Sequence, residues 1–197
     1  MLHPDTELKL VDPEVGYGVF ATRPLPAGTI TYVRDALEVT VTPAAYRRCA
    51  PELRASVDRY SYVDERGDRV VSWDFAKYVN HCCRPNSMST GYGFEVALRD
   101  IAAGEHITDE YALFNLEGPM RCSCGEPGCR GEIAPDDFER YAEDWDAQVA
   151  AVLPRVAEVD QPLWSLVDAG TRAALAADAG EYRSVMALRW RGAEVMV

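Results

Sequence analysis

A mainly β fold with helical additions is predicted by three features of this 197-residue sequence. Residues 8–73 contain short runs rich in β-branched and aromatic residues, separated by prolines and glycines that favour turns. After Gly131, apolar residues recur at helical spacing with acidic residues between them. Apolar residues make up 48% of the chain and charged residues 26%, which is ordinary for a folded domain. We therefore expect a β-rich body followed by a helical C-terminal region.

The expected elements follow in order along the chain. Strands are expected at residues 8–11, 18–21, 29–33, 37–41, 94–98 and 107–108, and a hairpin at 60–63 and 70–73. Thr42 and Pro43 are typical of a helix N-cap and first turn, which predicts a helix running toward Val57. Further helical stretches are expected from Phe138 to Val156, from Leu163 onward, and from Tyr182 to Trp190.

The net charge restricts the classes of partner. Lys and Arg number 20 and Asp and Glu 32, so the charge is 20 − 32 = −12. Phosphate backbones repel such a surface, so we expect no direct nucleic-acid binding, and a cationic partner is favoured instead. Solubility alone also explains this charge. No run approaches the roughly 20 apolar residues of a membrane span, and residues 1–5 do not have the features of a signal peptide. We expect no membrane association and a cytoplasmic protein, or a nuclear one in a eukaryote.

The spacing of the six cysteines points to a metal site more than to disulfides. Cys122, Cys124 and Cys129 form a C-x-C-x4-C cluster, and the glycines and proline between them suit a tight chain reversal. Three thiolates can bind one Zn²⁺, but a closed structural site needs a fourth ligand. The candidates for that ligand are Cys49, Cys82, Cys83 or a histidine. The alternative is a group of thiols without metal.

Three other segments hold residue types suited to binding or catalysis. They are Gly16–Ala21, which contains Gly-x-Gly, Asn80–Asn86 (N-H-C-C-R-P-N), and Ala97–Tyr111, which ends in an acid–tyrosine pair. Glycine permits close backbone approach to a ligand, a polar loop supplies amides and free backbone groups, and a tyrosine can orient a reacting group. Each segment taken alone is equally explained as a turn, a polar loop or a packed tyrosine.

The order of these four motifs resembles the SET-domain family of protein lysine methyltransferases, with its post-SET zinc motif. The resemblance spans about residues 8–131. It implies a SET-domain β-fold in which the Asn80–Asn86 segment threads through a loop as a pseudoknot, followed by a zinc-bound post-SET segment and the helical tail. We expect the SET domain over residues 1–117, the post-SET segment over 118–132 and a helical extension over 133–197.

The resemblance also implies roles for individual residues. The family's cofactor is S-adenosyl-L-methionine, and the matching positions that would bind it are Gly16, Tyr17, Gly18, Asn80, His81 and Tyr111. Tyr111 matches the family's catalytic tyrosine. Cys83 matches the fourth zinc ligand, so the implied Zn²⁺ site is Cys83, Cys122, Cys124 and Cys129.

The chain departs from the family pattern at several positions. Cys82 stands where the family usually has Ser, Lys77 and Tyr78 stand where Arg and Phe are common, and Ser123 replaces a bulkier residue. Aromatic candidates for the walls of a substrate channel are Tyr32, Tyr60, Tyr62, Trp73, Tyr78, Tyr92 and Phe114. No general base is evident from the sequence, so proton loss to water is the working interpretation.

The function implied by the resemblance is methyl transfer to a lysine side chain of a basic protein, such as a histone-like one. One alternative keeps the methyl transfer but gives it a small-molecule amine as acceptor. Another is a SET-fold interaction module without catalysis. The apolar stripe after Gly131 is expected to pack on the body or on a second copy of the chain, so a homodimer through this region is left open.

Overall fold

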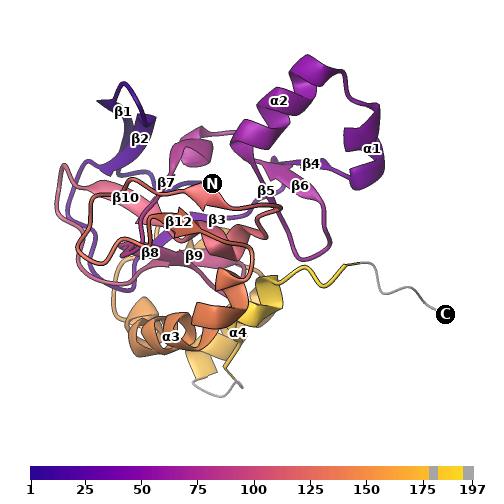
Figure 1. Cartoon of the computed structure of the whole chain (residues 1–197). Helices are drawn as coiled ribbons and strands as arrows, with labels where there is room; N and C mark the ends of the chain where they lie inside the picture. Colours follow the sequence, from indigo (N-terminus) through magenta and orange to yellow (C-terminus); the bar gives the residue numbers. More distant parts are fainter. Residues whose placement is uncertain (178–181, 193–197) are drawn as a thin grey trace.

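The computed structural model describes residues 1–177 and 182–192. Its first sheet places distant parts of the chain side by side. Its strand order is β1 (Thr6–Asp12), β2 (Gly16–Ala21), β10 (His106–Asp109) and β7 (Asn80–His81). β10 pairs antiparallel with β2 and parallel with β7. Strands from three of the sequence motifs therefore lie next to one another (Figure 1).

Three smaller sheets complete the β-rich body. They are β3 (Ile30–Val33) with β9 (Phe94–Ala97) and β8 (Ser87–Ser89), β4 (Val39–Val41) with β6 (Arg69–Val71) and β5 (Ser61–Val63), and β11 (Met120–Arg121) with β12 (Glu132–Ile133). Two short 3-10 helices, η1 (Phe75–Tyr78) and η2 (Tyr111–Phe114), precede β7 and follow β10. Every strand expected from the sequence is present with its ends within two residues of the expectation, which confirms the mainly β fold class. The two-residue strands and β8 were not expected.

The single helix expected after Thr42 is wrong, because two helices form there. α1 (Pro43–Arg48) begins as predicted, with the Thr42 hydroxyl accepting a hydrogen bond from the Ala45 N–H at 3.2 Å. α2 (Pro51–Tyr60) follows after a break in which Ala50 is extended, with ψ of 152°. A proline disfavours helical backbone in the residue before it, so Pro51 ends one helix and opens the next. Both helices pack beside β4–β6, at the upper right of Figure 1.

The C-terminal helices are shorter than their apolar patterns predict. α3 (Asp137–Val152) was expected to reach Val156, but η3 (Leu153–Ala157) takes over because Pro154 has no N–H to continue the α-helical bonding. The stretch from Leu163 forms η4 (Trp164–Leu166) and α4 (Ala169–Ala177).

The helix expected from Tyr182 to Trp190 is also wrong, since only η5 (Val185–Leu188) forms there. Asp146 of α3 explains the difference. Its carboxylate accepts hydrogen bonds from the Tyr182 hydroxyl at 2.9 Å, the Ser184 hydroxyl at 2.6 Å and the Val185 N–H at 2.7 Å. These bonds hold the segment against α3 in a non-helical conformation.

The C-terminal region completes two of the three hydrophobic cores of the body. Val152, Val156, Leu163 and Val167 pack with Ile30, Val33, Phe94 and Val96, and Phe138, Trp145 and Val149 pack with Met88 and Leu113. The third core lies under the first sheet, around Val19, Ala97 and Ile107. The apolar stripe of α3 is therefore buried on the body, below the sheets in Figure 1. Within residues 1–177 and 182–192, no helix is both long and apolar enough to cross a bilayer.

Gly28 fixes how closely η3 approaches the β-rich body. Its φ is +93°, and a Cβ there would lie 2.7 Å from the Cβ and 2.8 Å from the carbonyl carbon of Arg155. Gly104 has a similar φ of +80° but open space around the missing Cβ. Substitutions at these two glycines therefore distinguish the cost of a positive φ from the cost of a steric clash.

We expect Gly28→Ala to lower the free energy of unfolding by about 1–3 kcal/mol more than Gly104→Ala, because only the first adds a clash to the strain of a positive φ. Urea unfolding followed by tryptophan fluorescence measures both variants. Equal losses in the two variants would contradict the close contact with Arg155.

Candidate functional site

Four cysteine sulfurs converge between β7 and the segment that links β11 to β12. The Sγ atoms of Cys83, Cys122, Cys124 and Cys129 all lie within 4.8 Å of one another. The Cys83–Cys122 and Cys122–Cys129 separations are 3.6 Å, and the Cys83–Cys129 separation is 4.0 Å. A tetrahedron of Zn–S bonds of about 2.3 Å has edges of about 3.8 Å, so this donor set fits zinc.

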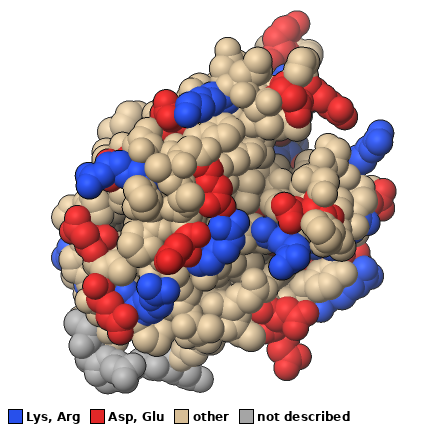
Figure 2. Space-filling model, turned by 90° about the vertical axis from the view of Figure 1, so that its left-hand side faces the viewer, with Lys and Arg blue, Asp and Glu red and all other residues tan. Residues whose placement is uncertain are grey.

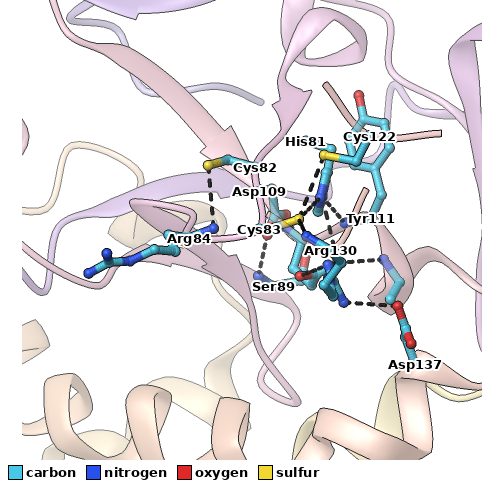
Figure 3. Close-up of polar contacts among 12 residues, drawn as sticks. His81, Cys82, Cys83, Arg84, Ser89, Asp109, Tyr111, Cys122, Arg130 and Asp137 are labelled. Carbon is cyan, nitrogen blue, oxygen red and sulfur yellow. Dashed lines mark hydrogen bonds and ion pairs between the residues drawn. The ribbon is translucent and has the colours of Figure 1, made fainter. Parts of the chain in front are cut away.

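Neither of the other two candidate cysteines belongs to this group of four. The Cys82 sulfur accepts a hydrogen bond from the Arg84 N–H at 3.3 Å, and Figure 3 shows it directed away from Cys83. The Cys49 thiol donates to the carbonyl of Ala45 at the end of α1. The structure thus brings Cys83, and neither Cys82 nor Cys49, into the group of four sulfurs, and the zinc ligands implied by the family resemblance stay a prediction.

Backbone N–H groups surround the sulfur cluster. The Arg130 N–H points at the Cys83 sulfur at 3.4 Å, and the Gly131 N–H points at the Cys129 sulfur at 3.4 Å. Donors aimed at sulfur favour the thiolate, which is the form that binds a metal. Both the distances and the donors are therefore compatible with a zinc site made of four cysteine thiolates.

His81 connects this cluster to Tyr111. Its Nδ1 lies 3.2 Å from the backbone N of Tyr111, and its Nε2 lies 3.4 Å from the Cys83 sulfur (Figure 3). Since Nδ1 must accept from an N–H, the neutral ring carries its proton on Nε2 and donates to the sulfur. Burial, with the nearby charge of Arg130, lowers the pKa of His81 to about 4, so the ring is neutral near pH 7. Both ring nitrogens are used within the protein, which leaves only the His81 backbone free to contact a cofactor.

Arg130 joins the cysteine segment to two other elements. Its guanidinium donates to both carboxylate oxygens of Glu110, at 2.7 and 2.6 Å, and to Asp137 at the start of α3, at 3.1 Å. The Glu110 and Asp137 side chains are only 1% and 4% exposed. Burial raises the pKa of Glu110, and the bonds from Arg130 oppose that rise. Figure 3 shows Arg130 between the sulfur cluster and Asp137.

The phenol of Tyr111 faces a cavity of about 260 Å³, here called the Tyr111 cavity. Its hydroxyl donates to the carbonyl of Val79 at 2.6 Å, just before β7. Burial raises the pKa of Tyr111, and the nearby carboxyl groups of Asp109 and Glu95 add to the rise. Tyr111 is therefore a neutral hydrogen-bonding group fixed in the cavity wall.

A second cavity, of about 380 Å³, shares a wall with the first and is here called the Arg34 cavity. The residues that line both cavities are Tyr32, Tyr62, Val63, Glu95 and Phe114. Of the aromatic residues expected to line a channel, Tyr32, Tyr62 and Phe114 form this shared wall and Tyr60 lines the Tyr111 cavity alone. Trp73, Tyr78 and Tyr92 line neither cavity.

The expected cofactor residues lie beside the Tyr111 cavity, but only Tyr111 lines it. The Asn80 amide donates to the carbonyl of Tyr17 at 3.0 Å, and a Cβ on Gly18 would lie 2.9 Å from the same amide nitrogen. Gly18 is thus required for the approach of Asn80, whereas Gly16 has φ of +84° in an open turn.

A row of aromatic rings connects the Gly-x-Gly turn to the cavity. The ring of Tyr17, which is 53% exposed, meets Tyr78 edge-on at 6.3 Å, and Tyr78 meets Tyr60 at 5.5 Å. Tyr60 lines the Tyr111 cavity. A long ligand that extends from this cavity toward β2 would pass along these three rings.

Three charged residues of the site are not among the predicted site residues. Arg130 directly follows the last cysteine of the C-x-C-x4-C cluster, Glu95 falls in the strand expected at residues 94–98, and Asp109 falls in the motif Ala97–Tyr111 without a role of its own. The alternation of apolar and polar residues in β9 is a signal for Glu95, because its neighbours Phe94 and Val96 are apolar and face the core, so Glu95 faces the other side of the strand. Asp109 offered none, since its burial depends on β8 packing against β10.

Comparisons with known proteins agree with this architecture. Residues 16–112 match the family model described as SET domain. The chain therefore belongs to the SET-domain family. The expected domain boundaries at residues 117 and 132 lie outside this match and stay predictions.

The relatives are named histone-lysine methyltransferases. A "Histone H3-lysine(4) N-trimethyltransferase" of Arabidopsis thaliana is 32% identical over 74% of this chain, and a "Histone-lysine N-methyltransferase, H3 lysine-4 specific" of Candida albicans is 31% identical over 59%. The chain spans only 14% and 12% of these two proteins. A crystal structure of a Plasmodium falciparum protein named as a histone methyltransferase covers 56% of this chain and 95% of its own, with 14% identity and a TM-score of 0.42.

We expect the purified chain to contain one zinc ion, measured by inductively coupled plasma mass spectrometry. Cys83→Ser removes one of four ligands and should leave the metal substoichiometric, and Cys49→Ser is the matched control that keeps it. Equal zinc content in both variants would exclude Cys83 as a ligand.

We expect Arg130→Leu to lower the free energy of unfolding by about 3–5 kcal/mol, because it leaves the buried Glu110 carboxylate without its cation, whereas Asp137 keeps its pair with Arg140. Arg140→Leu is the matched control, since Arg140 also pairs with Asp137 but its side chain is 58% exposed. An exposed pair contributes at most about 1 kcal/mol. Urea unfolding distinguishes the two, and similar losses would show that the Arg130 pairs are weak.

Proposed function

We propose that the chain is an S-adenosyl-L-methionine-dependent protein-lysine N-methyltransferase. The observation that carries this proposal is the pair of adjoining cavities with the Tyr111 phenol in the wall of one of them. Membership of the SET-domain family and relatives named histone-lysine methyltransferases support the same reaction.

Two adjoining cavities suit a reaction between two ligands that enter from different sides. We propose that the cofactor occupies the Tyr111 cavity and extends toward Gly16, Tyr17, Gly18, Asn80 and His81. When bound, S-adenosyl-L-methionine supplies a methyl group on a positive sulfonium. The acceptor side chain would enter through the Arg34 cavity and meet the methyl group at the shared wall. This arrangement aligns the attacking nitrogen with the methyl carbon, which lowers the entropic part of the barrier.

The acceptor amine must be neutral to attack. A free lysine has a pKa of about 10.4, so deprotonation at pH 7 costs about 4.6 kcal/mol. The aromatic rings of Tyr32, Tyr62 and Phe114 in the shared wall would lower this cost, because an enclosed apolar surface disfavours the ammonium form. The neutral phenol of Tyr111, held by Val79, would then orient the reacting groups.

We propose that zinc has a structural role. Cys83, Cys122, Cys124 and Cys129 would hold it with no open coordination position, and no reaction step uses it. Through His81 and Arg130 the site would position the Tyr111 turn and the segment between β11 and β12.

The acceptor is proposed to be a basic, histone-like protein. The net charge of −12 favours approach of a cationic partner. Figure 2 shows acidic and basic side chains interspersed on the face in view, so on this face the excess of acid is spread rather than gathered in one patch. Around α3, Asp136, Asp137, Glu139 and Asp146 are engaged within the protein. These acids are therefore not free to bind a basic protein at α3, and the support for this partner is the general attraction by the net charge.

We expect methyl-labelled S-adenosyl-L-methionine and the purified chain to label core histones. Tyr111→Phe should lower transfer by at least about 100-fold with nearly unchanged cofactor affinity by calorimetry, because the phenol is positioned for the reacting groups. Tyr46→Phe is the matched control, since Tyr46 lies in α1 and bonds Asp58 on the surface.

The same assay separates the alternative functions. Labelling of free amines but not of histones or cell-extract proteins would indicate a small-molecule acceptor. A chain that binds no cofactor would be an interaction module and would overturn the proposed activity.

A further inference from the structure

Two carboxyl groups meet at the wall shared by the two cavities. Glu95 lies in β9 and lines both cavities, and Asp109 ends β10 and is fully buried. Ser89 connects them, because it is the partner of Glu95 in the β8–β9 pairing and its hydroxyl bonds Asp109. Asp109 accepts hydrogen bonds from the Ser89 hydroxyl at 3.0 Å and from the Glu110 N–H at 2.6 Å. Glu95 is thus the member of the pair that faces the open space.

Neither carboxyl has a cation as partner within residues 1–177 and 182–192. Arg34, which lines the Arg34 cavity, pairs with Asp64 at 2.9 Å. Lys77, in the Tyr111 cavity, donates to the carbonyl of Ser72. An enclosed carboxylate without a cation costs several kcal/mol, so a pair of them is unusual unless a ligand supplies the missing charge.

Several groups on the elements around the pair are neutral or already paired. The neutral groups are Tyr32 of β3, which bonds Glu38, Tyr62 of β5, Ser89 of β8 and Tyr111 of η2. The paired groups are Glu110 with Arg130, Arg34 with Asp64, and the amine of Met1 with Asp35. The charged neighbours of Glu95 are Asp109 and the amine of Met1, and the charged neighbour of Asp109 is Glu110.

The walls beside Glu95 suit a cation. The rings of Tyr32, Tyr62 and Phe114 line the same two cavities and would pack against the alkyl part of a side chain, and the Glu95 carboxyl would meet its charged end. A flexible alkyl chain that ends in an ammonium would fit against this aromatic wall with the Glu95 carboxyl beside it. The aromatic wall and the carboxyl pair together define the chemical class of the ligand.

We propose that Glu95, backed by Asp109, binds the ammonium group of the acceptor and takes its proton before methyl transfer. This inference rests on the proposed methyltransferase function and assigns it the general base that the sequence does not reveal.

The proton balance of this step is simple. The pair carries one negative charge and one shared proton, and the acceptor enters as R–NH3⁺. One N–H bond breaks, the proton binds the carboxyl pair, and R–NH2 remains with its electron pair free to form the N–C bond while the sulfur keeps the electrons of the S–C bond. Enclosure favours this transfer, because it turns two charged groups into two neutral ones. Burial raises the pKa of Asp109 to about 7 and raises that of Glu95 too, so the pair can accept and release a proton near neutral pH.

Binding of a simple amine tests the site without requiring catalysis. Calorimetry at pH 7.5 compares n-butylammonium with its neutral analogue n-pentanol. We expect Glu95→Gln to weaken n-butylammonium at least about tenfold and to leave n-pentanol unchanged, with partial recovery in Glu95→Asp. Glu65→Gln is the matched control, because it removes an exposed acid from the Arg34 cavity without touching the pair. Equal binding of n-butylammonium by wild type and Glu95→Gln overturns the proposal.

The pH dependence of transfer to core histones tests the proton step. The base acts when deprotonated, so kcat of the wild type should fall as pH drops through about 7 and level off above it. Glu95→Gln and Asp109→Asn should lower kcat about 100-fold at pH 7.5 and lose the plateau, with the rate rising toward pH 10 as the amine itself deprotonates. Cofactor affinity reports whether each variant is folded.

The two tests distinguish failure of the proposed function from failure of this inference. Glu95-dependent binding of n-butylammonium without methyl transfer to any acceptor would remove the proposed function and leave the cation site. Methyl transfer with the wild-type plateau retained in Glu95→Gln would remove the inference and leave the proposed function.

Discussion

The ion pair between Arg130 and Glu110 is the interaction on which the rest of the site depends. Glu110 directly precedes Tyr111, and Arg130 directly follows Cys129, so two bonds of 2.6–2.7 Å join the turn that carries Tyr111 to the cysteine segment. The same guanidinium reaches Asp137 at the start of α3. Because the Glu110 carboxylate is almost completely buried, loss of the arginine would leave this desolvated charge without a cation, which is far more costly than loss of a surface pair.

The sulfur cluster and the tyrosine are connected by a second, uncharged link. His81 accepts from the backbone of Tyr111 and donates to Cys83, so its neutral tautomer is determined by its two partners. A metal bound by Cys83 would strengthen this link, since a thiolate is a better acceptor than a thiol. Metal binding and the position of the phenol are in this way parts of one hydrogen-bonded unit, although the proposed reaction has no step at the metal.

The C-terminal region is part of the folding unit that carries the site. Its apolar residues complete two cores of the β-rich body, and Asp146 of α3 holds the last described segment through three hydrogen bonds. Leu188 at the end of that segment lines the Arg34 cavity. Residues more than 70 positions from Tyr111 therefore shape the cavity through which an acceptor is proposed to enter.

The sequence alone determined the fold class, most strands, and three of the four cysteines that converge, because turn residues and motif spacing are local properties of the chain, whereas Cys83 followed only from the family resemblance. It misplaced the helices near Pro51 and Pro154 and the segment held by Asp146, where a proline or a tertiary hydrogen bond overrides an apolar period. Only the tertiary structure decided that His81 uses both ring nitrogens inside the protein and that Glu95 meets Asp109. These pairings join residues from different strands, and the desolvation that gives them their chemistry exists only once the strands have packed.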